Sequence, residues 1–191
     1  LNPGNVDFQE VLNSKIYVDK SELIQYTNSV LRTTQKYICV SRPRRFGKSM
    51  AANMLTAYYS RGCDSREMFQ GLKIAKHTGF EEHLNQYNVI HLNMRDYLTE
   101  SENMKQLIQF VEEDLLDELQ QEFADLRMPR RRTLVKVLEQ AFAQYKIPFV
   151  FIIDEWDCIF RVHKSDAASQ KTYLDFLRNL LKDKSYICLL Y

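Results

Sequence analysis

The chain has 191 residues, a formal net charge of +1, 45% hydrophobic residues and 27% charged residues. This length fits one domain with a substantial core, and the composition is that of an ordinary soluble globular protein. The near-neutral charge gives no global attraction to nucleic acid or acidic membranes. No apolar run reaches the ~18 residues that a membrane span needs. We therefore expect a single cytoplasmic domain over residues 1–191, without a membrane partner.

The four cysteines, Cys39, Cys63, Cys158 and Cys188, are widely spaced and form no CxxC pair. This spacing supports neither a zinc site nor a disulfide framework. We expect small buried side chains in a reducing compartment.

The first 35 residues read as a lead-in, in which Asp19 and Glu22 have the spacing of a helix capping box. Residues 36–41 are expected to form the first core strand. The residues after Ser49 predict a helix that ends near Gly62, since Met50 and Met54 recur at helical spacing.

Further along, residues 72–75 are expected to form a short strand, and residues 89–94 a strand that runs into a polar Arg95–Asp96 end. Apolar stripes predict long helices around residues 107–123, 134–145 and 173–181. Residues 149–153 are the most apolar run and predict a buried strand, and residues 186–191 predict another. This alternation indicates an α/β fold with a mainly parallel sheet flanked by helices.

The segment from Ser41 to Ser49 reads Ser-Arg-Pro-Arg-Arg-Phe-Gly-Lys-Ser and lies between the first strand and a helix. Its last three residues match the end of a phosphate-binding loop, although Arg42 stands where the first glycine is expected. Gly47 lets the backbone approach a phosphate, Lys48 reaches the β- and γ-phosphates, and the Ser49 hydroxyl is a ligand for Mg²⁺. A lone Gly-Lys-Ser tripeptide is weak evidence, and its alternative is a helix start with a solvated lysine.

A second motif follows about a hundred residues later, where the strand at 149–153 ends in Asp154 and Glu155. Open α/β sheets bind their ligands at the carboxyl ends of their strands. Asp154 is therefore expected to hold Mg²⁺, and Glu155 to polarise the attacking water. The alternative is a strand that ends in acids because it reaches solvent. An adjacent base for water suits a nucleoside triphosphate hydrolase better than a small-molecule kinase.

Three motifs are combined in this chain: Tyr17–Ile24 (YVDKSELI), Ser41–Ser49 and Ile152–Asp157 (IIDEWD). Together they resemble the predicted AAA-ATPase family of bacteria, which belongs to the ASCE group of P-loop NTPases. The resemblance implies a P-loop three-layer sandwich and ATP as the nucleotide. It also implies that the missing glycine is a family trait, since the family's loop reads Arg-Pro-Arg-Arg-Phe-Gly-Lys-Ser. Asp157 matches a further family acid, and Trp156 replaces the usual Tyr.

From these motifs we expect Mg-dependent ATP binding and ATP hydrolysis. The expected catalytic residues are Glu155 and Lys48, and the expected metal ligands are Ser49 and Asp154. The residues expected to contact the nucleotide are Arg44, Arg45, Phe46, Gly47, Lys48, Ser49 and Met50.

The resemblance further implies that the chain stops before the end of the ATPase core. Longer members continue into a nuclease-like region, and ATPases of this kind often complete their sites in trans. A homo-oligomer and a nucleic-acid partner of a C-terminal region are therefore further expectations. Two alternatives to hydrolysis stay open: a nucleotide-gated regulatory module with little turnover, and the ATPase part of a nucleic-acid-processing protein. The loop arginines could contact phosphate or pair with carboxylates such as Asp157 or Asp96.

Overall fold

The computed structural model describes residues 1–41 and 46–191, which divide into two compact units. Unit 1 comprises Leu1, Leu92–Lys146 and Ile153–Tyr186. Unit 2 comprises Asn2–His91, Ile147–Ile152 and Ile187–Tyr191. Neither unit is one continuous segment, because the chain passes repeatedly between them. The expectation of a single domain over the whole chain stays a prediction.

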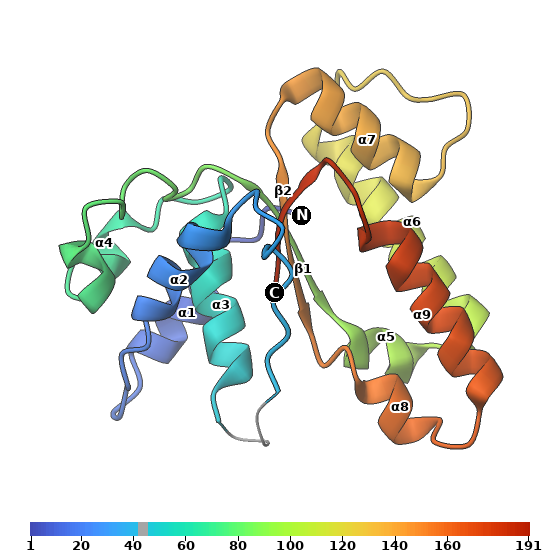
Figure 1. Ribbon diagram of the computed structural model, residues 1–191, viewed down its shortest axis with the longest axis horizontal. Coiled ribbons are helices and arrows are strands. Elements are labelled where there is room, and N and C mark those ends of the chain that lie inside the picture. The colour runs from blue at the N-terminus through green and yellow to red at the C-terminus, as the bar shows by residue number, and fades with distance from the viewer. Residues whose placement is uncertain (42–45) are drawn as a thin grey trace. The chain divides into compact units, whose positions relative to one another are not determined.

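Unit 2 holds the N-terminal helices. They are α1 (Val6–Leu12), α2 (Glu22–Val30), α3 (Lys48–Tyr59), α4 (Arg66–Phe69) and the 3-10 helix η1 (Lys73–Lys76). Helix α1 packs against α3 and α2 packs against η1, and Figure 1 shows α1, α2 and α3 side by side. The predicted helix after the loop is thus confirmed as α3. The short strand predicted at residues 72–75 is wrong, because this segment turns as η1.

Three strands form a parallel sheet in the order β1-β2-β3. They are β1 (Asn88–Asn93), β2 (Phe149–Asp154) and β3 (Ile187–Leu190). All three confirm predicted strands, and the α/β class with helices flanking a parallel sheet is confirmed with them. The polar end predicted for the first of these strands instead begins helix α5 (Met94–Glu100).

The segment that leads into the expected phosphate loop lies beside β3. Tyr37 forms a parallel bridge with Leu190, and the Ile38 N–H donates to the Leu190 carbonyl over 2.8 Å. Within residues 36–41 only Tyr37 pairs in this way, so the predicted first strand is reduced to one bridge. β3 therefore lies between the loop-bearing segment and β2, an order compatible with a P-loop NTPase fold.

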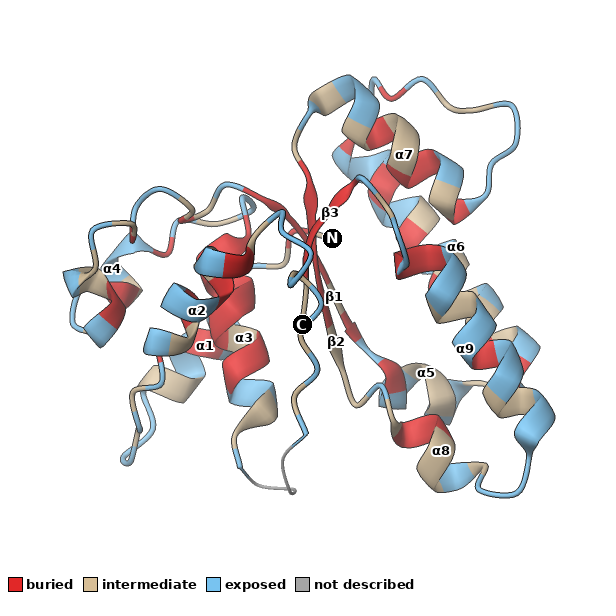
Figure 2. Ribbon diagram, in the orientation of Figure 1, coloured by how far each residue is buried: buried red, intermediate tan, exposed pale blue. Residues whose placement is uncertain are grey.

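The core of unit 2 joins its helices to one face of the sheet. Val150 and Ile152 are two residues apart on β2, so their side chains share a face, and both are fully buried. They belong to the same apolar cluster as Leu55 and Tyr58 of α3, both of which are also fully buried. Figure 2 shows this continuous buried face of α3. The helix that carries the end of the loop is thus anchored by its second half.

Unit 1 holds the remaining helices. They are α5, α6 (Met104–Glu122), α7 (Leu134–Tyr145), α8 (Cys158–Val162) and α9 (Ala167–Leu181). Helix α6 packs against both α7 and α9. Its predicted apolar stripe is buried, from Leu107 to Leu119 at successive turns. The long predicted helices are thereby confirmed, whereas the short helix α8 was not expected.

All four cysteines are free thiols. Burial raises the pKa of the Cys158 thiol to about 11 and that of Cys188 to about 12, so both stay protonated at neutral pH. Cys39 is exposed and Cys63 only half-buried, so the expectation of buried cysteines is wrong for Cys39. Over residues 1–41 and 46–191, no helix is long and apolar enough to cross a membrane.

Candidate functional site

The end of the expected phosphate loop is a left-handed glycine followed directly by a helix. Gly47 has φ +75° and is the N-cap of α3, which begins at Lys48. Glycine adopts this conformation without the steric cost that a Cβ would bring. Arg44 and Arg45, which we expected to contact the nucleotide, lie outside the described residues.

The first turn of α3 offers backbone donors. The first N–H groups of a helix have no partner within it, and the helix dipole adds partial positive charge there. Within the described part of the chain, no side chain caps this end of α3. Ser49 and Met50 are exposed and Lys48 is half-buried. The described residues therefore leave this end of α3 available to an anion.

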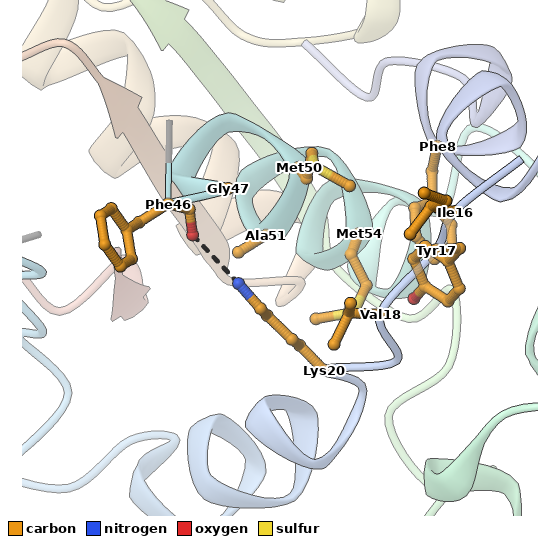
Figure 3. Close-up of a pocket in the computed structure, with 10 residues that line it drawn as sticks. All are labelled: Phe8, Ile16, Tyr17, Val18, Lys20, Phe46, Gly47, Met50, Ala51 and Met54. Carbon is orange, nitrogen blue, oxygen red and sulfur yellow. Dashed lines mark hydrogen bonds between the residues drawn. The ribbon is translucent and has the colours of Figure 1, made fainter. Parts of the chain in front are cut away.

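Lys20 reaches the loop from the lead-in. Its Nζ donates to the carbonyl oxygen of Phe46 over 3.0 Å, as the dashed line in Figure 3 shows. The same Nζ lies 3.3 Å from where a Cβ on Gly47 would stand. Because the C=O and N–H of one peptide point in opposite directions, a Phe46 carbonyl held toward Lys20 turns the Gly47 N–H the other way.

The turn before α2 that carries Lys20 is itself fixed by its neighbours. The Asp19 carboxylate accepts hydrogen bonds from the backbone N–H groups of Ser21 and Lys73, both over 2.8 Å. The Ser21 hydroxyl accepts from the Ile74 N–H over 3.1 Å. The predicted capping box is therefore wrong, because Ser21 is the N-cap of α2 and Asp19 bonds outside that helix. Asp19 and Ser21 instead join this turn to η1.

Hydrogen bonding also changes the charge state of Asp19. Partial burial acts to raise its pKa, but the hydrogen bonds from Ser21 and Lys73 and the charge of Lys73 outweigh burial. The pKa of Asp19 is consequently lowered from its ordinary 3.8. The carboxylate is thus ionised at neutral pH, which favours the two bonds that it accepts.

A pocket of about 340 Å³ lies beside Lys20 and the loop in unit 2. Most of its lining is apolar, and Figure 3 shows the Lys20 side chain along one side of it. The lining residues are Phe8, Ile16, Tyr17, Val18, Lys20, Phe46, Gly47, Met50, Ala51 and Met54. Four of them are large apolar side chains that remain exposed: Ile16, Val18, Phe46 and Met50. The pocket therefore offers unburied apolar surface directly beside the end of the loop.

The predicted acid pair lies in unit 1, at the end of β2. Asp154 and Glu155 are both half-buried, and one Asp154 oxygen accepts the Glu155 N–H over 2.8 Å. Glu155 has φ +52°, a left-handed conformation that is rare for a residue with a side chain. Such backbone strain persists where the surroundings enforce it and is concentrated at functional sites. We call residues 154–158 the acid turn.

An arginine that the sequence reading missed holds the acid turn. The Arg161 guanidinium is ion-paired with the carboxylates of both Glu155 and Asp157. Burial acts to lower the Arg161 pKa, but these two acids outweigh it and raise the pKa above its ordinary value. The only signal in the sequence for this ion pairing is the spacing of Asp157 and Arg161, which is that of a helical i,i+4 pair.

The structure groups the expected site residues in two places. Phe46 to Met50 lie together in unit 2, and Asp154 and Glu155 lie together in unit 1. Asn93, which ends β1, is engaged in capping α5, since its side chain accepts from the Arg95 N–H. Within the described ranges, no three His, Cys, Asp or Glu side chains cluster so as to hold a metal ion.

A parallel sheet, a helix that follows a left-handed glycine, and a strand that ends in two acids are compatible with a P-loop NTPase. A comparison with protein-family models matches residues 4–186 to the family described as "Predicted AAA-ATPase". The chain belongs to this family, which confirms the resemblance and implies ATP binding in general. Comparisons with curated proteins and with solved structures find no match.

Proposed function

We propose that this chain binds Mg·ATP and transfers the terminal phosphoryl group to water. Membership of the predicted AAA-ATPase family supports an ATP-binding, ATPase-like function in general. The observation that carries the proposal further is the start of α3, where left-handed Gly47 leads directly into Lys48 and Ser49. An open helix N-terminus that begins Lys-Ser suits a triphosphate.

In this proposal the phosphates lie at the N-terminus of α3. Backbone N–H groups of the first turn donate to phosphate oxygens, and the Lys48 ammonium balances the charge on the β- and γ-phosphates. Phe46, Gly47 and Met50 are proposed to make the remaining contacts with the nucleotide. Arg44 and Arg45 are proposed to add guanidinium contacts to phosphate oxygens.

The proposed metal ligands are Ser49 and Asp154. Hydroxyl and carboxylate oxygens are the donors that Mg²⁺ prefers, and the ion keeps several waters, so few protein ligands suffice. One Asp154 oxygen already accepts the Glu155 N–H. Among the hydrogen bonds of residues 1–41 and 46–191, none reaches the second oxygen, which is proposed to bind a metal or its water. When bound, Mg²⁺ neutralises charge that develops on the phosphates. Glu155 is proposed to orient and polarise the attacking water.

The pocket beside the loop is proposed to hold the adenine base. A base has two apolar faces, and stacking it against Val18 and Met50 would remove exposed apolar surface from water. Both residues line the pocket, with 64% and 39% of their surface exposed. The pocket also borders Gly47, so a base bound there is adjacent to the proposed phosphate position.

Two variants test binding and hydrolysis separately. Lys48→Ala removes a charged contact worth about 2 kcal/mol, so ATP affinity should fall about 30-fold in a titration. The matched control Lys76→Ala, an exposed lysine of η1, removes the same charge and should bind as wild type. Glu155→Gln should still bind ATP but release phosphate ~100-fold more slowly. Wild type that binds ATP without releasing phosphate, even with partners supplied, would reject hydrolysis in favour of a nucleotide-gated module.

The base site has its own test. Val18→Ser should weaken ATP binding about fivefold through lost apolar contact, yet leave the affinity for inorganic tripolyphosphate unchanged. Val6→Ser is the control, because Val6 is 67% exposed on α1 and does not line this pocket. Equal losses for ATP and tripolyphosphate would place the base elsewhere.

A further inference from the structure

Arg161 bridges two carboxylates of the acid turn. Its NH2 group pairs with Oε2 of Glu155, and its NH1 group donates to Oδ2 of Asp157 over 3.0 Å. The three side chains are partly shielded, with 32% of Arg161, 24% of Glu155 and 44% of Asp157 exposed. Partial burial and the charged donor make these contacts stronger than ordinary surface ion pairs.

The backbone beneath these side chains is fixed from three sides. The Glu155 N–H donates to Asp154, and the Glu155 carbonyl accepts from the Cys158 N–H over 2.9 Å. The hydroxyl of buried Tyr173 on α9 donates to the Trp156 carbonyl over 3.0 Å. Cys158 and Ile159 of α8 are buried, which holds the short helix that carries Arg161. The acid turn therefore presents Arg161 and Glu155 from a rigid frame.

We propose that Arg161 is a positioning residue for ATP hydrolysis, because its guanidinium fixes the Glu155 carboxylate in the orientation that aligns the attacking water. This inference rests on the function proposed above. Arg161 does not touch the nucleotide in this proposal and acts only through Glu155. It also gives Asp157 a role, as the anchor that orients the guanidinium.

The contact pattern favours positioning. Arg161 engages only Oε2 of Glu155, and no other hydrogen bond reaches this carboxylate from the rest of the described chain. Oε1 is therefore the oxygen that can accept a hydrogen bond from water. Without Arg161 the three acids at 154, 155 and 157 would repel one another, and Glu155 would lose this orientation. A displacement of about 1 Å in such a group costs on the order of 100-fold in rate.

The test compares steady-state ATP hydrolysis and ATP affinity in five forms of the full chain. They are wild type, Arg161→Ala, Arg161→Lys, Glu155→Gln and the double variant Arg161→Ala/Glu155→Gln. Arg161→Ala should lower kcat roughly 10- to 100-fold, with KM and ATP affinity unchanged. Arg161→Lys should restore part of kcat, because one ammonium keeps the charge but cannot fork between two carboxylates. The double variant should be no slower than Glu155→Gln alone, because Arg161 acts through Glu155.

Arg178→Ala is the matched control, since it removes an arginine of α9 that pairs with Asp175 on the exposed surface of unit 1. It should hydrolyse ATP as wild type does. An unchanged or raised kcat in Arg161→Ala, beside a slow Glu155→Gln, would overturn the inference and leave the proposed function standing. A kcat loss in the double variant that multiplies the two single losses would also overturn it. A Glu155→Gln variant with wild-type turnover would reject the proposed hydrolytic role and this inference together.

Discussion

Replacement of Lys20 by methionine should weaken ATP binding, although Lys20 lies 26 residues before the carbonyl that it contacts. Methionine keeps an unbranched side chain of similar length but removes the Nζ that donates to Phe46. The Phe46–Gly47 peptide would then be free to rotate, so the Gly47 N–H would no longer be held pointing away from Lys20. A hydrogen bond from a charged donor at an exposed position contributes about 1 kcal/mol, which corresponds to roughly a fivefold loss of affinity.

The assay is a titration of ATP by calorimetry at two salt concentrations, with Lys15→Met as the control. Lys15 lies in the same lead-in and is exposed, so both variants lower the net charge equally. A loss caused by net charge would appear in both variants and would shrink in high salt. A loss caused by the Phe46 contact should appear in Lys20→Met alone and persist in salt. Equal affinities for the two variants would refute the positioning of the loop by Lys20.

Three further predictions concern stability. Tyr59→Phe should lower the free energy of unfolding by about 1–3 kcal/mol in denaturant titrations, because the buried Tyr59 hydroxyl lies 2.7 Å from the Thr27 hydroxyl. A loss below a few tenths of a kcal/mol would contradict this. Lys146 is the C-cap of α7 and has φ +60°, a conformation that glycine adopts more easily, so Lys146→Gly should stabilise the chain by about 1 kcal/mol. Lys136→Gly, inside α7, should destabilise it by a similar amount, because glycine disfavours a helix interior. Stability changes of the same sign would reject this reasoning. Asp19→Asn should lower the free energy of unfolding at neutral pH, because it removes the charge of the carboxylate. The difference from wild type should shrink as the pH falls below about 4 toward the lowered pKa of Asp19, since protonation removes that charge from wild type as well. A deficit independent of pH would show that the charge of Asp19 contributes nothing.

The sequence predicts the parts of the fold that depend on local pattern. Helices α6 and α7 follow from apolar residues at helical spacing, and β2 follows from an unbroken apolar run. The strand before the loop is less predictable, because its pairing depends on β3, about 150 residues later in the chain. The helix η1 is also hard to predict, because Ile74 is buried in the core of unit 2 although it lies in a short 3-10 turn and not in a strand.

In the candidate site, too, the residues of a local motif are predictable, whereas those placed by tertiary contacts are not. Gly47, Lys48 and Ser49 are predictable, because a short motif and its local chemistry are read directly from the chain. The function of Asp19 cannot be predicted in this way, because its partner Lys73 lies 54 residues away and a local capping role is the simpler interpretation. Arg161 stands six residues after Glu155, but a left-handed residue separates strand from helix there, and no helical spacing relates them. Tertiary contacts thus decide which polar residues support the site.

The acid turn also contains the sole tryptophan of the chain, Trp156. The residue is 37% exposed, and its ring packs edge-to-face with that of Phe160 at 5.9 Å between ring centres. Indole emission depends on solvent exposure, and light that tyrosine does not absorb would excite Trp156 alone. The unlabelled protein therefore carries an optical reporter next to Glu155. A change in its emission on adding ATP would reveal nucleotide-dependent rearrangement of the acid turn in real time.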